Sequence, residues 1–355
     1  MIYLNYAALS PTHVQVEQEV EKTLSEFKEH LYSDAGIEWY RAKVQHCREA
    51  VGALLHVSDQ SFIAFTPNAS TANYMLLSLI AWRPGDIILS TTHENPSIRN
   101  ELLALQHRGV ETHFLQPTSS PQQFLVSVQH ALQEQKVRAI ILSHVSHVDG
   151  RILPITEIAS LAKEHDSLCI VDGAQAIGQI DVKIESLDCD AYFFSGYKWC
   201  CGPLGTGGLI ISRRLLPHVP SVLSNPTSGE QYPASRFEIG THNIGLIAGL
   251  AKACAIKKQE GLNTEFSQNI RENAKNQLKD VKEIQLREWN GPHAPGILTF
   301  AHQQHDSLMK VFKKNHIVVK QFKDYPKSEI PTTRISWNST IDANDVTLAL
   351  AKIKQ

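Results

Sequence analysis

The chain has 355 residues, of which 42% are hydrophobic, and its 34 basic and 36 acidic side chains give a formal net charge of −2. This length is enough for one large α/β domain, or for a large and a small domain together. The near-neutral charge gives no electrostatic reason to expect a nucleic acid or a membrane surface as a partner.

The first residues, MIYLNYAALSP, have neither the basic start nor the long apolar run of a signal peptide. No apolar stretch reaches the roughly 18 residues that a membrane span needs. The six cysteines lack the spacing of a zinc site or of a disulfide framework. We therefore expect a soluble cytoplasmic protein without a bound metal.

Short apolar runs alternate with helical patterns along the first two thirds of the chain. Their apolarity is continuous, which is typical of strands that are covered on both faces. The predicted strands are residues 61–66, 86–90, 112–115, 138–143, 168–171, 190–194 and 208–212. Helices are predicted between them, for example at 155–165. This order predicts an α/β fold with a mainly parallel, seven-stranded sheet flanked by helices.

Beyond residue 215 the pattern changes. Prolines at 217, 220, 226 and 233 indicate a long irregular segment, and a helix is predicted at 243–259. The remaining residues mix helices with short strands, as in a smaller α+β domain. We predict a large domain of residues 13–245 and a small domain formed by residues 1–12 and 246–355.

Lys198 lies between an apolar strand and a glycine-rich loop, in AYFFSGYKWCCGPLGTGGLIIS (residues 191–212). A lysine amine attacks an aldehyde only when it is neutral, and apolar neighbours lower its pKa in that direction. A surface lysine is the alternative, but exposed loops seldom carry YFF on one side and WCC on the other. Lys198 is therefore a candidate for a Schiff base with pyridoxal phosphate (PLP).

Asp172 ends another apolar strand, in LCIVDGAQA (residues 168–176). A carboxylate at the carboxyl end of a parallel strand faces the crevice where open α/β sheets bind ligands. There it could keep the pyridinium nitrogen of PLP protonated. Taken alone, Asp172 fits the cap of the following helix about as well as it fits a cofactor contact. Gln175, three residues on, could donate to the hydroxyl of the PLP ring.

A phosphate site is predicted where a strand, a polar turn and a helix follow one another, in FIAFTPNASTANYMLLSLIAW (residues 62–82). Ser70 and Thr71 would lie at the helix start, where free backbone N–H groups and the helix dipole attract anions. An ordinary helix cap remains the alternative. Ser195 and Tyr197, close to the lysine, could add donors.

Three segments together resemble the class V aminotransferase group of fold-type I PLP enzymes. They are VDGAQAIGQI (171–180), FSGYKWCCGPLGTGGLII (194–211) and RFEIGTHNI (236–244). YLNYAALSP (3–11) and RISWNSTIDANDVTLALAKI (334–353) are also similar to the branch of cysteine desulfurases, selenocysteine lyases and cystine C–S lyases. The resemblance covers nearly the whole chain.

The resemblance implies a homodimer and a role for each matching residue. Lys198 would form the Schiff base and move the Cα proton, and Arg334 would bind the substrate carboxylate. Thr241 would reach the phosphate of PLP across the dimer interface. The other implied cofactor contacts are Ser70, Thr71, Asn95, Asp172, Gln175, Ser195 and Tyr197, and Ala8 and His147 would face the substrate.

Three departures from the family pattern matter. Asn95 stands where many relatives have a histidine that stacks on the PLP ring, while His93 lies two residues earlier. His147 replaces an asparagine near the cofactor, and it could be an acid or base, a substrate contact or a structural residue. Persulfide-forming relatives carry a cysteine shortly before the carboxylate-binding arginine, but residues 321–334 contain none.

These features predict C–S bond cleavage in an amino acid by β-elimination, without an enzyme cysteine as nucleophile. Transamination and epimerisation by a member of the same family are the alternatives, and a non-catalytic PLP-binding module is a more remote one. Residues 195–198 also match the S-x-x-K motif of β-lactamase-like enzymes, but the S-D-N and K-T-G motifs that accompany it are missing.

Overall fold

A seven-stranded sheet forms the centre of the molecule. The computed structural model describes residues 1–33, 35–220, 232–322 and 331–353. The strand order is β2-β8-β7-β6-β5-β3-β4, and only β8 runs antiparallel to its neighbours. The strands are β2 (Ile63–Thr66), β3 (Ile87–Thr91), β4 (Glu111–Leu115), β5 (Val137–Ser143), β6 (Leu168–Asp172), β7 (Ala191–Ser195) and β8 (Gly207–Ile211). Each predicted strand overlaps one of them, so the predicted sheet is confirmed.

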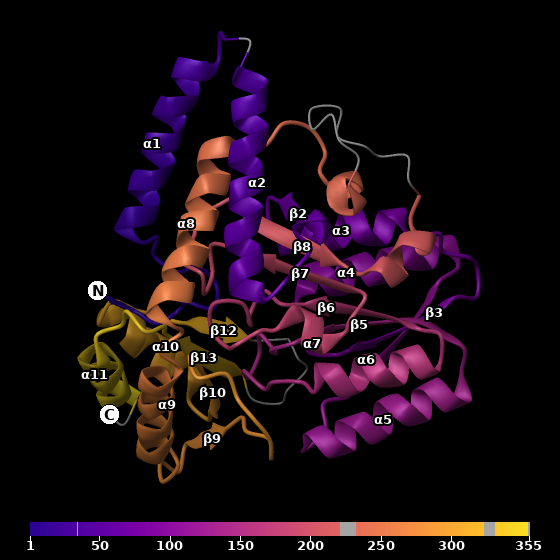
Figure 1. Ribbon diagram of the computed structural model, residues 1–355. Coiled ribbons are helices and arrows are strands. Elements are labelled where there is room, and N and C mark those ends of the chain that lie inside the picture. Colours follow the sequence, from indigo (N-terminus) through magenta and orange to yellow (C-terminus); the bar gives the residue numbers. More distant parts are fainter. Residues whose placement is uncertain (34, 221–231, 323–330, 354–355) are drawn as a thin grey trace.

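Helices cover both faces of this sheet (Figure 1), which explains the continuous apolar runs. Successive side chains of β5 point to opposite faces. Ile140 and Leu142 join the core with α5 (Pro121–Glu134) and α6 (Ile155–Glu164). Ala139 and Ile141 join the core beneath the helices of the opposite face. Those helices are α3 (Ala69–Leu79) and α4 (Pro96–Ala104).

Two long helices extend beyond the sheet as a hairpin (Figure 1). They are α1 (Val14–His30) and α2 (Gly36–Leu55), and α8 (Ile244–Glu260) packs along both. The helix predicted at 243–259 is α8. Short helical turns, α7 (Ile184–Leu187), Arg213–His218 and Pro233–Phe237, complete this part of the chain. Most of the predicted irregular segment, including Pro226, lies outside the described residues.

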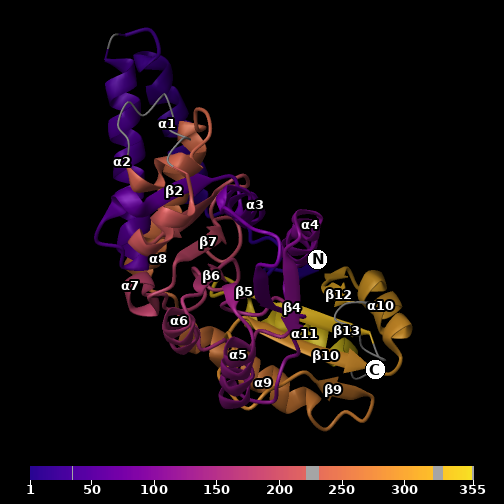
Figure 2. The ribbon, with the colours of Figure 1, turned by 90° about the vertical axis from the view of Figure 1, so that its right-hand side faces the viewer.

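A smaller antiparallel sheet lies beside the large one, close to both chain termini (Figure 2). Its order is β12 (Lys320–Phe322), β13 (Thr332–Ser336), β10 (Ile297–His302) and β9 (Ile284–Leu286). Helices α9 (Thr264–Leu278), α10 (His305–Lys314) and α11 (Ala343–Ile353) accompany it. The N-terminal strand β1 (Ile2–Tyr3) pairs with β11 (Ile317–Val318). The two sheets fall within the two predicted domains, and the domain boundaries themselves stay a prediction.

None of the helices in the described ranges combines the length and the apolar character that crossing a membrane requires.

Candidate active site

A cavity of about 640 Å³ lies where the carboxyl ends of the large sheet meet the small sheet and the N-terminal segment. This is the edge at which open α/β sheets bind ligands. Ten of the predicted site residues line it: Ala8, Ser70, Asn95, His147, Asp172, Gln175, Ser195, Tyr197, Lys198 and Arg334. Thr71, Thr241 and His93 do not belong to its lining.

Lys198 and Asp172 come from neighbouring strands of the large sheet. Asp172 is the last residue of β6, and Lys198 lies in the turn after β7. Burial lowers the pKa of the lysine, and Arg334 adds to this effect while Asp172 opposes it. Burial likewise raises the pKa of the Asp172 carboxyl, against the charge of Lys198 and a hydrogen bond of 2.7 Å from the Ala174 backbone N–H. The lysine is thus shifted toward its neutral, nucleophilic form.

The Gln175 side chain is fixed at both ends. Its Nε2 donates to the Ala7 carbonyl at 2.9 Å, and its Oε1 accepts from Nε1 of Trp199 at 2.8 Å. Trp199 is fully buried beside Lys198. Gln175 therefore faces the cavity in one orientation, with a second amide N–H still available for a ligand.

The start of α3 forms a polar corner of the cavity. The helix cap is Asn68, whose Oδ1 accepts from the backbone N–H and the hydroxyl of Thr71 at 2.8 and 3.1 Å. Both polar groups of Thr71 are thus hydrogen-bonded within the N-terminus of its own helix. Ser70 donates to Oγ of Ser97 at 2.9 Å, and Ser195 Oγ accepts from the Ala69 N–H at 3.0 Å. Ser70 and Ser195 bring hydroxyls to an anion-attracting helix terminus.

Arg334 is buried at the far side of the cavity, on β13. Its Nη1 donates to the His147 carbonyl, and its Nη2 donates to Oδ1 of Asn5 at 3.3 Å. Nε is buried without a hydrogen-bond partner among the described residues. Burial lowers the pKa of the guanidinium to about 9, so it remains a cation near neutral pH. A fixed guanidinium with an unsatisfied N–H suits a carboxylate.

His147 is a neutral imidazole in this arrangement. Its Nδ1 lies 3.1 Å from the His93 carbonyl, which can only accept, so Nδ1 carries the proton. Burial and the charges of Arg334 and Lys198 hold its pKa well below the usual range. A neutral ring that is fixed in this way favours a contact role over that of a proton-donating acid.

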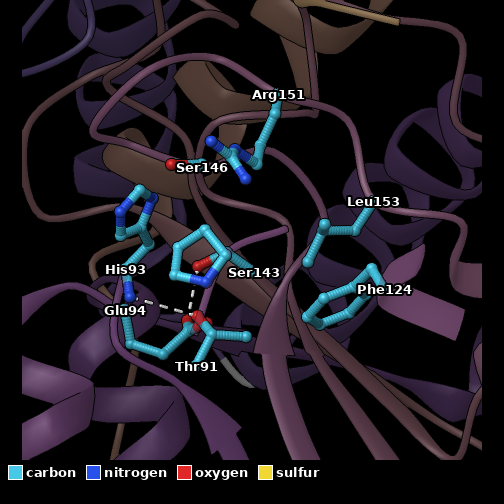
Figure 3. A pocket seen from close by; sticks show the side chains of 9 residues that line it. Thr91, His93, Glu94, Phe124, Ser143, Ser146, Arg151 and Leu153 are labelled. Carbon is cyan, nitrogen blue, oxygen red and sulfur yellow. Dashed lines mark hydrogen bonds between the residues drawn. The ribbon is translucent and has the colours of Figure 1, made fainter. Parts of the chain in front are cut away.

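Asn95, and not His93, faces the cavity. Asn95 caps α4, with Oδ1 accepting from the backbone N–H of Ser97 at 3.0 Å. His93 lies in a second, small pocket of about 10 Å³, beside Glu94 and Arg151 (Figure 3). There its Nδ1 is 3.7 Å from Oδ2 of Asp149.

Among the other residues of the lining are Asn5, Lys320 and Phe322, which sequence patterns did not identify. Asn5 lies in the YLNYAALSP segment, which resembles the family but contains no motif that marks a site residue. Lys320 and Phe322 belong to the short strand β12, whose position beside Arg334 depends on tertiary pairing. No sequence motif marked them.

All six cysteines are buried and unpaired. None lines the cavity in the described part of the chain, and burial raises the pKa of Cys201 above its ordinary value. Cys200 and Cys201 follow Lys198 closely in the sequence but are buried, which fits a packing role.

The fold and the cavity define an α/β enzyme of the PLP-dependent type, with a lysine and an aspartate at the ends of neighbouring strands. The family model described as aminotransferase class V matches residues 2–321, and the chain belongs to this family. The resemblance stated from the sequence is thereby confirmed, together with the enzyme class and the cofactor.

Among known proteins, a cysteine desulfurase of Escherichia coli O157:H7 (strain EC4115) is 30% identical over 311 residues, covering 81% of this chain and 74% of that protein. Two solved structures share the fold. A complex of the cystine C–S lyase C-DES with its product cysteine persulfide has a TM-score of 0.86 at 22% identity, and covers 100% of this chain and 97% of the other. Apo cysteine desulfurase from Thermococcus onnurineus NA1 has a TM-score of 0.85 at 21% identity, with 99% and 94% covered.

Proposed function

We propose that this protein is a PLP-dependent lyase that cleaves the Cβ–S bond of an amino acid by β-elimination. The observation that carries the proposal is a cavity that joins Lys198, Asp172 and Arg334 without a cysteine in its described lining. The similarity to cysteine desulfurases supports sulfur-containing amino acids as substrates.

The residues of the cavity fit PLP. Ser70, Ser195 and Tyr197 would hold the phosphate at the start of α3. Asp172 would pair with the ring nitrogen, Gln175 with the ring hydroxyl, and Asn95 would lie against the ring. PLP, when bound, attaches the substrate amine covalently and accepts the electrons left at Cα.

The protein's own residues then have distinct tasks. Arg334 binds the substrate carboxylate and so fixes the orientation of Cα. Lys198, in its neutral form, would take the Cα proton. The Cβ–S bond breaks, and the sulfur leaves with the bonding electron pair and gains a proton. Addition of water completes the balance, so that an S-substituted cysteine yields a thiol, pyruvate and ammonia.

Transamination is the second candidate, because the family model carries the name of an aminotransferase. Holoenzyme incubated with a panel of amino acids separates the two. Pyruvate formed together with sulfide, thiol or persulfide supports the lyase. A 2-oxo acid that appears only with an added acceptor would replace the lyase with the aminotransferase. A spectral change without product would leave only a PLP-binding module.

A homodimer and a cytoplasmic location belong to the same proposal. Thr241 is exposed just before α8 and lies outside the cavity of its own chain, which supports a role at a subunit interface. Six unpaired cysteines support a reducing compartment. Light scattering on the purified protein gives the mass: a dimer supports this arrangement, and a monomer with full activity contradicts it.

A further inference from the structure

Two cations lie directly opposite each other at the rim of the active-site cavity. In the antiparallel pair of β12 and β13, Lys320 is the partner of Arg334, so both side chains leave the same face of the small sheet. Both residues line the cavity. Like charges in directly opposite positions are destabilising, and a bound anion relieves this repulsion.

Phe322 lies between the two cations. It is two residues beyond Lys320 on β12 and therefore shares its face. Its ring centroid is 5.8 Å from the Lys320 Nζ and 5.6 Å from the Arg334 guanidinium carbon. The ring is buried, as is Arg334, whereas Lys320 is exposed. From the inside of the cavity to its mouth, the groups are therefore the Arg334 guanidinium, the Phe322 ring and the Lys320 ammonium.

Among the described residues, the cavity holds one cation, Lys320, that the contacts proposed for the cofactor and the α-carboxylate leave unused. Its described lining holds three cations, Lys198, Lys320 and Arg334, and one acid, Asp172. Lys198 and Asp172 are assigned to the cofactor, and Arg334 to the substrate carboxylate. Lys320 forms no ion pair with an acidic residue of the described ranges.

We propose that Lys320 binds a second anionic group, carried by the substrate's side chain beyond the β-sulfur. The inference rests on the proposed lyase function and narrows its substrates to S-substituted cysteines that end in a carboxylate or a sulfonate. Arg334 holds the α-carboxylate inside, Phe322 contacts the apolar part of the side chain, and Lys320 receives the outer anion at the mouth of the cavity.

The test compares three substrates with the holoenzyme. S-Carboxymethyl-L-cysteine carries the outer carboxylate, S-sulfo-L-cysteine carries a sulfonate, and S-methyl-L-cysteine is the neutral reference. For Lys320→Met, the kcat/KM ratio of each anionic substrate to the neutral one falls at least about tenfold, equivalent to ~1.4 kcal/mol. Lys320→Arg keeps most of the ratio. Lys310→Met, at an exposed lysine of α10 outside the cavity, leaves the ratio unchanged.

Each outcome has a different consequence for the role of Lys320 and for the proposed lyase function. Loss for only one of the two anions identifies that anion as the natural group. An unchanged ratio in Lys320→Met overturns the role of Lys320, while cleavage of S-methyl-L-cysteine leaves the lyase standing. If no substrate is cleaved, the proposed lyase function is refuted, independently of the role of Lys320. In that case the dissociation constant of each amino acid is measured from the absorbance change of the bound cofactor. A ratio of anionic to neutral affinity that is unchanged in Lys320→Met then overturns the role of Lys320, and a lower ratio supports it.

Discussion

The indole N–H of Trp199 donates a hydrogen bond of 2.8 Å to Oε1 of Gln175. Trp199 directly follows Lys198, and Gln175 lies three residues after Asp172. This bond therefore connects the turn that carries the lysine with the turn that carries the carboxylate. Because Trp199 is fully buried, the connection is shielded from water.

Replacing Trp199 by Phe should weaken PLP binding. The change removes the indole N–H and leaves Oε1 of Gln175 buried without a hydrogen bond. An unsatisfied buried acceptor of this kind costs about 1–3 kcal/mol of free energy. The expected result is a PLP dissociation constant raised several-fold, measured by titrating the apoprotein. Trp289→Phe is the matched control, because that indole donates to the Pro292 carbonyl outside the cavity. Equal PLP affinity in both variants would refute a contribution of the Trp199–Gln175 hydrogen bond to PLP binding.

Replacing Arg334 by Lys should raise KM for amino-acid substrates at least about tenfold, since a single ammonium cannot make the bidentate contact of a guanidinium. Steady-state kinetics on the holoenzyme measure the effect. Arg213→Lys, at an exposed arginine that pairs with Asp59, is the control and should keep the wild-type KM. A normal KM in Arg334→Lys would remove the carboxylate role.

Glu94 should make stability depend on pH. Its carboxyl is buried, accepts hydrogen bonds from Thr91 at 2.5 Å and Ser143 at 2.6 Å, and has its pKa raised from 4.5 to about 7, chiefly by burial (Figure 3). A raised folded-state pKa gives stability that is complete below pH 4.5 and is lost as the pH rises through 7.

The Glu94→Gln variant lacks this titration. Relative to wild type, its free energy of unfolding should therefore improve between pH 5 and pH 8, by at most about 3 kcal/mol. Urea unfolding at several pH values measures the difference. Glu157→Gln, at an exposed position of α6, should show no such trend. A constant offset between Glu94→Gln and wild type across this range would mean that Glu94 is not protonated in the folded protein.

Sequence patterns predicted the large sheet and the residues at its strand ends well. Buried parallel strands carry continuous apolar runs, and the polar residue that ends each run must lie at the ligand-binding edge, as Asp172 and Ser195 do. The glycine after Asp172 also has a local reason. A Cβ at Gly173 would lie 1.9 Å from Cε1 of Tyr192, so no other residue fits this close approach.

Side-chain direction was harder to predict. Thr71 was expected at the phosphate, but the cap of α3 is Asn68, which holds Thr71 at the helix end. Whether His93 or Asn95 faces the cavity depended on where the strand ends and the next helix begins, which sequence periodicity does not resolve to one residue. The pairing of Lys320 with Arg334 arises from strand register in a small sheet, and no local pattern indicates it.

Lys198 is the residue to which the cofactor should be covalently attached, and borohydride reduction of the purified holoenzyme tests this attachment directly. Reduction fixes the bond between PLP and its lysine, and peptide mass spectrometry then locates the added group. We predict a single modified peptide with the group on Lys198, and no modified lysine in the Lys198→Ala variant. Attachment at a different lysine, or a Lys198→Ala variant that keeps both the cofactor's absorbance band and full activity, would show that Lys198 does not hold the cofactor.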